Sequence, residues 1–457
     1  MKIIVLGAGA VGLSVANVLS AEANDVTVVD LDDSLLGDVQ DRLDINTIHG
    51  MGSHPEILEK AGAPDADMII AVTSNDETNM IACQIASTIY HIPTKVARVR
   101  SSSYLKTKNL FAPEAIPIDV VISPEQIVTD HIQRLIDYQG ALQVLDFAGG
   151  RVQMVGIKAY SGGPLIGERL RTIRQHIPGI NAKVTAIYRK ENAIMPTGDT
   201  FVEIDDDIFF LAEKKHIRKV MSEMRHIERP VKRIVLAGGG HVGKRLAKAL
   251  ERNYQVKLIE QSKERVRHLS ETLHNTLILH GDVADEELLA EENIDRMDIF
   301  CAITNDDEAN IMSAMLAKRM GAKKVMAIIN RSAYVDLIEG GDIDIVISPR
   351  QVTIGTLLAH VRRGDIVAVH SLRKGAAEAI EVVAHGDEQT SKVVGRRIDD
   401  LDLPPGSTIG AVVRGDEVLI LEREIVVQPD DHIILFLADK NCIPAVERLF
   451  QVDVGFI

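Results

Sequence analysis

Short apolar runs recur along the chain, each followed by a glycine or polar turn and then by an amphipathic segment. Strand patterns that alternate with helix patterns in this way predict βαβ units and a parallel sheet. The predicted fold class is therefore α/β. The strands expected in the first half span residues 2–6, 26–29, 68–72 and 95–99, and those in the second half span residues 233–236, 256–259, 298–303 and 324–329.

The chain is also a tandem repeat. Placing Gly7 over Gly238 gives an offset of 231 residues (238 − 7), and Thr73 then falls on Thr304. Further along, an Ile-Ser-Pro motif that begins at 122 matches one that begins at 347. The offset here is 225, and the difference from 231 is explained by loops of different length in the two copies. Serine caps orphan amides and proline suits a first helical turn, so each motif predicts the start of a helix. These helices are expected to end near 137 and 362.

A small β-rich module is expected after each Rossmann unit, because the pattern changes there to short strands separated by glycine, proline and charged turns. Such strands are expected at 150–157 and 207–211, and the pair Asp205-Asp206 corresponds to Asp430-Asp431 before an apolar run. A charged linker at 223–232 divides the halves. The expected domains are a Rossmann domain at 1–139, a small α+β domain at 140–230, a second doubly wound Rossmann domain at 231–363 and a second small domain at 364–457.

A dinucleotide-binding motif opens the first copy. It follows a strand, begins a helix, and consists of Gly7, Ala8, Gly9, Ala10, Val11 and Gly12. The first glycine allows a tight turn, the second a close approach of phosphate and the third helix packing, while amides at the helix start face the pyrophosphate. Asp30 ends the next strand, where an acid can bind the ribose hydroxyls. The alternative, glycines that serve only a turn, does not explain this acid.

The second copy repeats the motif with its own acid. Its expected nucleotide-binding residues are Gly238, Gly239, Gly240, His241, Val242, Gly243, Glu260, Asp282 and Thr304. Because both ribose-site acids would repel a 2′-phosphate, NAD(H) or an adenine nucleotide such as ATP or ADP is preferred to NADP.

Polar residues follow the apolar strand at 68–72 and its copy at 298–303. They include Thr73 and Ser74 in the first copy and Thr304 in the second, and they lie at the carboxyl edge, where ligands bind in such sheets. Their hydroxyls and amides can bind a nucleotide. The alternative, which is compatible with binding, is that this segment caps the next helix.

Positive charges differ between the copies. Arg98 lies at the same edge and can meet phosphate or adenine, or form an ion pair, whereas its counterpart is Ile328 or Ile329. The second copy instead has Lys244 and Arg245 in the first helical turn, near a GxxxxGK pattern. Arg245 replaces the Ser or Thr that would hold magnesium, so hydrolysis is not expected. These charges either favour a more phosphorylated ligand or form a solvated helix face.

Composition narrows the function classes. A length of 457 residues predicts three or four domains, and the formal charge of −15 disfavours a continuous basic surface for nucleic acid. Three cysteines far apart, with no CxxC pattern, argue against a disulfide framework or a zinc site and fit a reducing cytoplasm. Cys301, inside an apolar run, is expected to be a buried hydrophobe. Neither a signal peptide nor a run of 18 apolar residues is found, so any membrane connection is expected to go through a partner.

No catalytic residue and no metal site is expected. A dehydrogenase needs an acid or base beside the nicotinamide, and the small modules offer no convincing candidate. His131, His176, His216 and His226 lack repeating partners and are expected to be surface histidines, and neither HExxH nor GxSxG occurs. Two alternatives stay open: an NAD-dependent oxidoreductase of unusual architecture, and a regulator of another cation transporter such as a cation/proton antiporter.

These two motif units, each followed by an Ile-Ser-Pro helix and a small β module, make the whole chain resemble the TrkA family of tandem regulators of potassium conductance (RCK) in bacterial Trk systems. The resemblance implies RCK N (KTN) domains that bind NAD(H) or ATP/ADP, and RCK C (TrkA-C) domains. It also implies a homotetrameric ring that is cytoplasmic, at the inner face of the membrane beneath a TrkH-like potassium channel subunit. The family's turn, ribose and adenine-edge positions fall on Gly7 to Val11, Asp30, Thr73, Ser74 and Arg98, and on Gly238 to Val242, Glu260 and Thr304, where the arginine is lacking.

Overall fold

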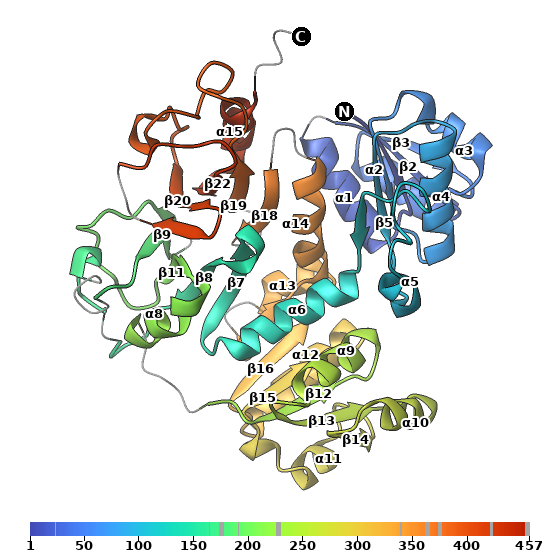
Figure 1. Ribbon diagram of the computed structural model, residues 1–457. Coiled ribbons are helices and arrows are strands. Elements are labelled where there is room, and N and C mark those ends of the chain that lie inside the picture. Colours follow the sequence, from blue (N-terminus) through green and yellow to red (C-terminus); the bar gives the residue numbers. More distant parts are fainter. Residues whose placement is uncertain are drawn as a thin grey trace. The chain divides into compact units, whose positions relative to one another are not determined.

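The structure is a computed structural model that describes residues 1–22, 24–163, 165–172, 178–190, 192–224, 230–338, 341–361, 366–372, 377–420 and 424–452. Within these ranges the chain forms four sheets, two parallel and two antiparallel (Figure 1). Contacts divide it into two compact units, Met1–Val128 and Thr129–Ile457, which are described separately.

The first unit is a Rossmann domain with a six-stranded parallel sheet in the order β3-β2-β1-β4-β5-β6. This is the doubly wound order, which reverses between β1 and β4 and opens a ligand crevice at the carboxyl ends of these strands. The strands are β1 (Lys2–Leu6), β2 (Asp25–Asp30), β3 (Asn46–His49), β4 (Met68–Ala71), β5 (Thr94–Arg98) and β6 (Val120–Ile122). The helices are α1 (Ala10–Ala21), α2 (Asp33–Arg42), α3 (Pro55–Lys60), α4 (Asp76–Thr88), α5 (Ser102–Lys106) and α6 (Pro124–Asp137), which continues into the second unit.

The second Rossmann domain has the same order, β14-β13-β12-β15-β16-β17, and helices on both faces of its sheet (Figure 1). The duplication and the α/β class predicted from the sequence are thus confirmed. Its strands are β12 (Arg233–Ala237), β13 (Gln255–Glu260), β14 (Thr276–His280), β15 (Ile299–Ala302), β16 (Lys324–Ile328) and β17 (Ile345–Ile347). Its helices are α9 (His241–Leu250), α10 (Lys263–Thr272), α11 (Glu286–Glu291), α12 (Asp307–Arg319), α13 (Ser332–Ile338) and α14 (Pro349–Val361).

The strands that were predicted from the sequence are those that are buried in the sheets. The central strands β1, β4, β12 and β15 are apolar and almost fully buried, as expected for parallel strands covered on both faces. The edge strand β3 has no fully buried residue, and its polar side chains hid it from the sequence analysis. Cys83 and Cys301 lie in the two Rossmann cores, and burial raises the pKa of each thiol to about 12. The expectation for Cys301 is confirmed.

Two antiparallel sheets follow the Rossmann domains, with orders β10-β9-β11-β8-β7 and β18-β19-β22-β20-β21. The first contains β7 (Ala141–Phe147), β8 (Val152–Lys158), β9 (Ala182–Arg189), β10 (Asn192–Ile194) and β11 (Asp207–Glu213), with helix α8 (Ile217–Met224). The second contains β18 (Ile366–Leu372), β19 (Ala377–Val383), β20 (Ser407–Arg414), β21 (Glu417–Ile420) and β22 (His432–Leu437), with helix α15 (Ile443–Phe450). Both therefore belong to small α+β domains, as predicted.

The two small domains share one hydrophobic core, which the sequence analysis did not foresee. Phe147 and Phe209 of the first and Phe436 of the second belong to the same buried cluster. Polar contacts join the domains as well: the Glu381 carboxylate accepts the backbone N–H of Ala148 at 2.8 Å.

The repeated aspartate pairs hold a matching ion pair in each small domain. Asp206 and Asp431 have fully buried side chains, and each accepts two hydrogen bonds from one guanidinium. Arg414 binds Asp431 at 2.8 Å and 2.7 Å, and Arg189 binds Asp206 at 2.9 Å through both nitrogens. Such a two-pronged contact compensates the desolvation of a buried carboxylate.

The prediction that His131 is a surface histidine is wrong. It lies on α6 one turn from Val128 and Leu135, and shares their buried face. Burial, with lesser contributions from Arg134 and His370, lowers its pKa from 6.5 to about 4. His216 is half-buried, and His176 and His226 lie outside the described residues, as does much of the predicted linker.

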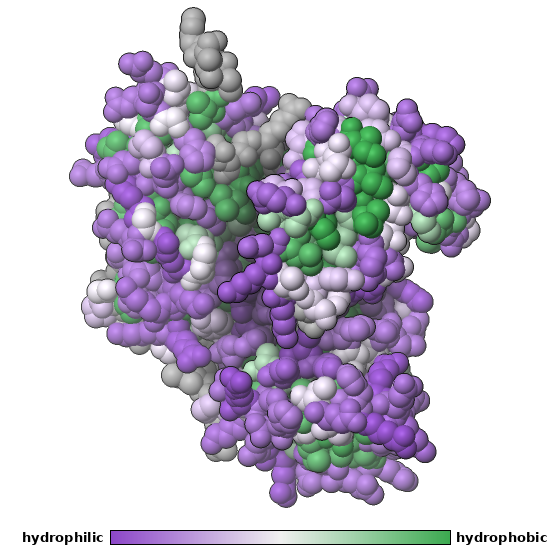
Figure 2. Space-filling view, turned by 45° about the vertical axis from the view of Figure 1, so that its right-hand side comes forward, coloured by the Kyte–Doolittle hydropathy of each residue, from purple (hydrophilic) through white to green (hydrophobic). Residues whose placement is uncertain are grey.

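The face shown in Figure 2 is mostly hydrophilic and is interrupted by hydrophobic patches. Large apolar side chains stay exposed at matching positions of the repeat, Ile81 on α4 (50% exposed) and Met312 on α12 (62%). None of the helices in the described ranges combines the length and the apolar character needed to cross a membrane.

Candidate functional site

Three glycines of the first motif have separate structural tasks. Gly7 adopts φ +104°, a left-handed conformation, and a Cβ there would lie 3.1 Å from the Thr73 backbone. Gly9 precedes helix α1 with an extended backbone, and a Cβ there would meet nothing within 4 Å. A Cβ on Gly12 would overlap the Gly7 carbonyl oxygen. Gly7 and Gly12 therefore build the turn, while Gly9 leaves open space in front of the helix.

The second motif has the same geometry. Gly238 adopts φ +119°, a Cβ on Gly240 would meet nothing within 4 Å, and one on Gly243 would overlap the Gly238 carbonyl oxygen. The open space before each helix is what a pyrophosphate needs to approach the free amides at the helix start. Ala10 and His241, the first helical residues, are exposed, and Val11 and Val242 are half-buried.

The two strand-end acids lie against the glycine turns. Asp30 accepts the backbone N–H of Ala8 at 2.5 Å, and Glu260 accepts that of Gly239 at 3.0 Å. The other oxygen of each acid accepts the amide two residues further along, at 3.0 Å and 2.7 Å. Both oxygens of Asp30 and Oε1 of Glu260 can accept a further bond, whereas Oε2 of Glu260 already accepts a second one from Arg265 at 3.5 Å. Both acids therefore stay able to bind a ribose hydroxyl while the turn fixes their position.

The predicted threonines are held by buried asparagines. Asn79 accepts the backbone N–H and the hydroxyl of Thr73 at 3.0 Å and 2.6 Å, and Asn310 does the same for Thr304 at 2.8 Å and 2.7 Å. Each asparagine also donates to the last carbonyl of the next strand, Arg98 or Ile328. This bond identifies Ile328, rather than Ile329, as the counterpart of Arg98. The residues that cap α4 and α12 are Asn75 and Asp306.

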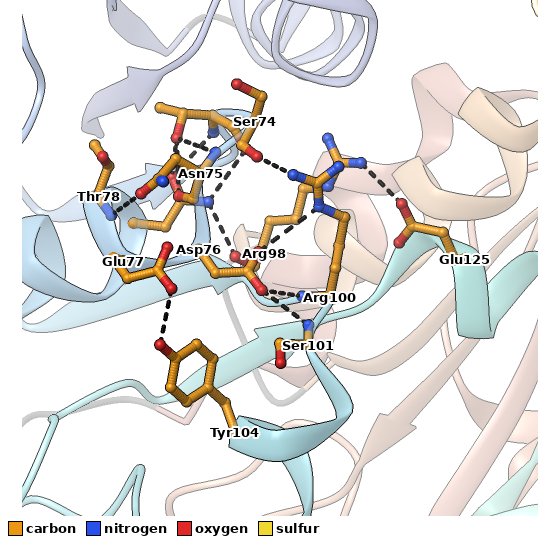
Figure 3. Close-up of polar contacts among 12 residues, drawn as sticks. Ser74, Asn75, Asp76, Glu77, Thr78, Arg98, Arg100, Ser101, Tyr104 and Glu125 are labelled. Carbon is orange, nitrogen blue, oxygen red and sulfur yellow. Dashed lines mark hydrogen bonds and ion pairs between the residues drawn. The ribbon is translucent and has the colours of Figure 1, made fainter. Parts of the chain in front are cut away.

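Arg98 forms an ion pair with Glu125, one of the two alternatives that the sequence left open. The guanidinium lies 3.0 Å from the carboxylate, and the side chains are only 18% and 14% exposed (Figure 3). Arg100, which the sequence analysis missed, donates to the Ser74 carbonyl oxygen and lies 3.7 Å from Asp76. The carboxyl edge of the first domain thus carries two arginines.

In the second domain the same edge borders a cavity of about 1050 Å³. Its lining includes the predicted residues Gly238, Gly239, Gly240, Glu260, Asp282 and Thr304, and also Arg265, Arg331 and Arg350. His241, Val242 and Gly243 are not among its lining residues. Neither is Lys244, whose amine donates to His268 at 2.7 Å on the exposed helix face.

Comparison with known proteins places both Rossmann domains in one family. The TrkA-N domain model matches residues 3–124 and 234–349, and the TrkA-C domain model matches residues 388–451. The Trk system potassium uptake protein TrkA of Halomonas elongata is 60% identical over 456 residues, and that of Vibrio alginolyticus 56% identical over 458 residues. Both matches cover 100% of this chain and of the relative.

Solved structures agree on the fold. The GsuK RCK domain superimposes with a TM-score of 0.62 at 16% identity, covering 98% of this chain and 94% of that chain. A GsuK channel bound to NAD gives 0.63 at 17% identity, covering 98% and 78%. Two domain matches and relatives similar along their whole length lead to one conclusion: the chain belongs to the TrkA family.

Proposed function

We propose that this chain is the nucleotide-binding regulatory subunit of a Trk-type potassium uptake system. The observation that carries the proposal is the duplicated site, in which a glycine turn, an open helix start and a strand-end acid come together twice. The closely similar relatives are named Trk system potassium uptake proteins. The expected role is regulatory rather than enzymatic, because these relatives are named as components of a potassium uptake system.

The proposed ligands are NAD(H) and the adenine nucleotides ATP and ADP. Asp30 and Glu260 suit the free ribose hydroxyls that these ligands share and would repel the 2′-phosphate of NADP. Structures of GsuK, which has the same fold, are described as bound to NAD and to ADP. Gly7 to Gly12, Thr73, Ser74 and Arg98 complete the first proposed site, and Gly238 to Gly243, Asp282 and Thr304 the second.

The proposed partner is a TrkH-like membrane channel subunit that conducts potassium, with this chain as a homotetramer at the inner face of the membrane. Ile81 and Met312 support an assembly, because exposed apolar side chains at matching helix positions suit burial against another subunit. A ligand that binds one arrangement of the Rossmann domains more tightly shifts the population toward it, and this shift is transmitted to the channel.

Nucleotide titration of single-site variants tests the binding proposal. Gly9→Asp and Gly240→Asp each place a carboxylate in the open space before a helix, where phosphate would approach. Calorimetry with NADH and ADP should show that each variant loses one class of sites and that the double variant loses both. Gly37→Asp is the matched control, since it adds the same charge where a Cβ also meets nothing within 4 Å. Unchanged binding by the double variant would overturn the proposed sites.

The two alternatives make different predictions. An NAD-dependent oxidoreductase would change absorbance at the nicotinamide band with some member of a metabolite panel, whereas a regulator would not. Purification of the chain from detergent-solubilised membranes should recover a potassium channel subunit. Recovery of a cation/proton antiporter instead would favour the other regulatory assignment.

A further inference from the structure

The two Rossmann domains differ at one pair of equivalent positions. In the first, Arg98 at the end of β5 pairs with Glu125, the second residue of α6. In the second, Ile328 ends β16 and Arg350 is the second residue of α14. The acid is replaced by an arginine and the arginine by an apolar residue, so the ion pair of the first domain has no counterpart at these positions.

This exchange leaves Arg350 without the acid that neutralises Arg98. Its Nε is buried and has no hydrogen-bond partner, as is also true of Arg98, but within the described ranges no ion pair joins Arg350 to a carboxylate as Glu125 is joined to Arg98. The side chain nevertheless lines the cavity of about 1050 Å³ beside the glycine turn. A buried donor without a partner costs free energy, and a ligand that accepts its hydrogen bonds recovers that cost.

The other charged groups of the cavity already have partners. Arg331 lies 2.7 Å from Glu308, and Arg265 lies 3.5 Å from Glu260. Asp307 accepts the backbone N–H groups of Asn330 and Arg331. Arg350 is therefore the lining cation whose charge these contacts do not neutralise.

We infer that Arg350 binds a phosphate group of an adenine nucleotide in the second cavity and makes this cavity prefer ligands with more phosphate charge. The inference rests on the proposed nucleotide-binding function and assigns a residue to it. A guanidinium binds phosphate oxygens through charge-assisted, often two-pronged hydrogen bonds. ADP, which carries more negative charge than NAD⁺, gains more from this contact. In the second copy the arginine of this position pair thus comes from helix α14 rather than from the end of the strand.

The test uses the full chain with the first site blocked by Gly9→Asp, so that calorimetry reports only the second cavity. In this background Arg350→Gln should weaken ADP binding about tenfold or more, reduce its dependence on salt, and weaken NAD⁺ binding less. Arg350→Lys should retain part of the affinity. The double variant Ile328→Arg/Arg350→Glu rebuilds the ion pair of the first domain, in which the acid neutralises the arginine, and should bind ADP more weakly than its parent. Thermal unfolding checks that each variant is folded.

Two results would overturn the inference while leaving the proposed function intact. One is ADP binding by the Arg350→Gln variant within twofold of its parent, with the same salt dependence. The other is that the Gly9→Asp parent, with Arg350 intact, binds neither ADP nor NAD⁺ although the wild-type chain binds them. The first site alone would then bind the nucleotide. Failure of the wild-type chain itself to bind either nucleotide would refute the proposed function as well.

Discussion

Substitutions at Gly9 and Gly12 should separate ligand binding from folding, although these glycines lie three residues apart in one motif. A Cβ on Gly12 would overlap the Gly7 carbonyl oxygen, which is backbone and cannot rotate away. Overpacking of this kind costs about 1–3 kcal/mol, partly offset by the better helix propensity of alanine, about 1 kcal/mol. Gly12→Ala should therefore lower the free energy of unfolding by up to about 2 kcal/mol. The midpoint of thermal unfolding should fall by roughly 2–4 °C for each kcal/mol of unfolding free energy that is lost.

Gly9→Asp should leave stability nearly unchanged. A Cβ at Gly9 meets nothing within 4 Å, and its backbone has φ −67° and ψ −176°, which any residue can adopt. Aspartate is moreover preferred to glycine at a helix N-cap. The variant should instead lose nucleotide binding at the first site, because its carboxylate occupies the space in front of the helix amides and repels phosphate.

Scanning calorimetry and NADH fluorescence titration measure the two effects on the same samples. Gly12→Ala should unfold at a lower temperature than the wild-type chain, whereas Gly9→Asp should lose binding at the first site and unfold normally. Gly243→Ala and Gly240→Asp provide an independent repeat in the second domain. The reasoning is refuted if Gly9→Asp unfolds earlier than Gly12→Ala, or if it binds the nucleotide at the first site with the wild-type affinity.

Three further predictions concern the rest of the chain. Arg414→Met should lower the free energy of unfolding by about 3 kcal/mol in urea titrations, because it leaves the fully buried Asp431 carboxylate uncompensated; an unchanged midpoint would contradict this. The pKa of buried His131 is about 4 against 6.5 unfolded, so the unfolded chain binds more protons between these values. This histidine should therefore cost no free energy of unfolding above about pH 6.5, and should lower it by on the order of 3 kcal/mol as the pH falls toward 4. His131→Gln should remove this pH-dependent loss. Only Cys442 should react quickly with a thiol reagent, since the two core cysteines are buried with pKa values of about 12; labelling of three thiols in the native protein would disprove it.

The sequence predicted the parts of the fold in which local pattern and burial agree. Central strands such as β1 and β12 are apolar and buried after their first residue, Lys2 or Arg233, and each is followed by a glycine motif. The edge strands β3 and β17 were missed for different reasons. β3 is mostly polar, whereas β17 is apolar but only three residues long, too short to show a pattern of its own. The shared core of the small domains was also beyond reach, since contacts such as that of Phe147 with the cluster of Phe436 join segments far apart in the chain.

For the site, the motif residues could be identified from spacing, but their supporting contacts could not. Asn79 lies inside a helix and carries no sequence signal, yet it fixes both Thr73 and the end of β5. In the second copy, Ile328 occupies the strand position that is equivalent to Arg98, so the sequence indicates no arginine there. Arg350 supplies a positive charge to the cavity from α14, and only the three-dimensional structure brings it there.

Nucleotide-dependent regulation of a channel can be measured as potassium flux through reconstituted vesicles. The membrane channel subunit that copurifies with this chain would be incorporated with wild-type chain or with the Gly9→Asp/Gly240→Asp double variant, and flux measured with and without NADH, ADP or ATP. At least one nucleotide should change the flux with the wild-type chain, and the double variant should abolish this change. Flux that is the same with and without every nucleotide in the presence of wild-type chain would contradict this expectation.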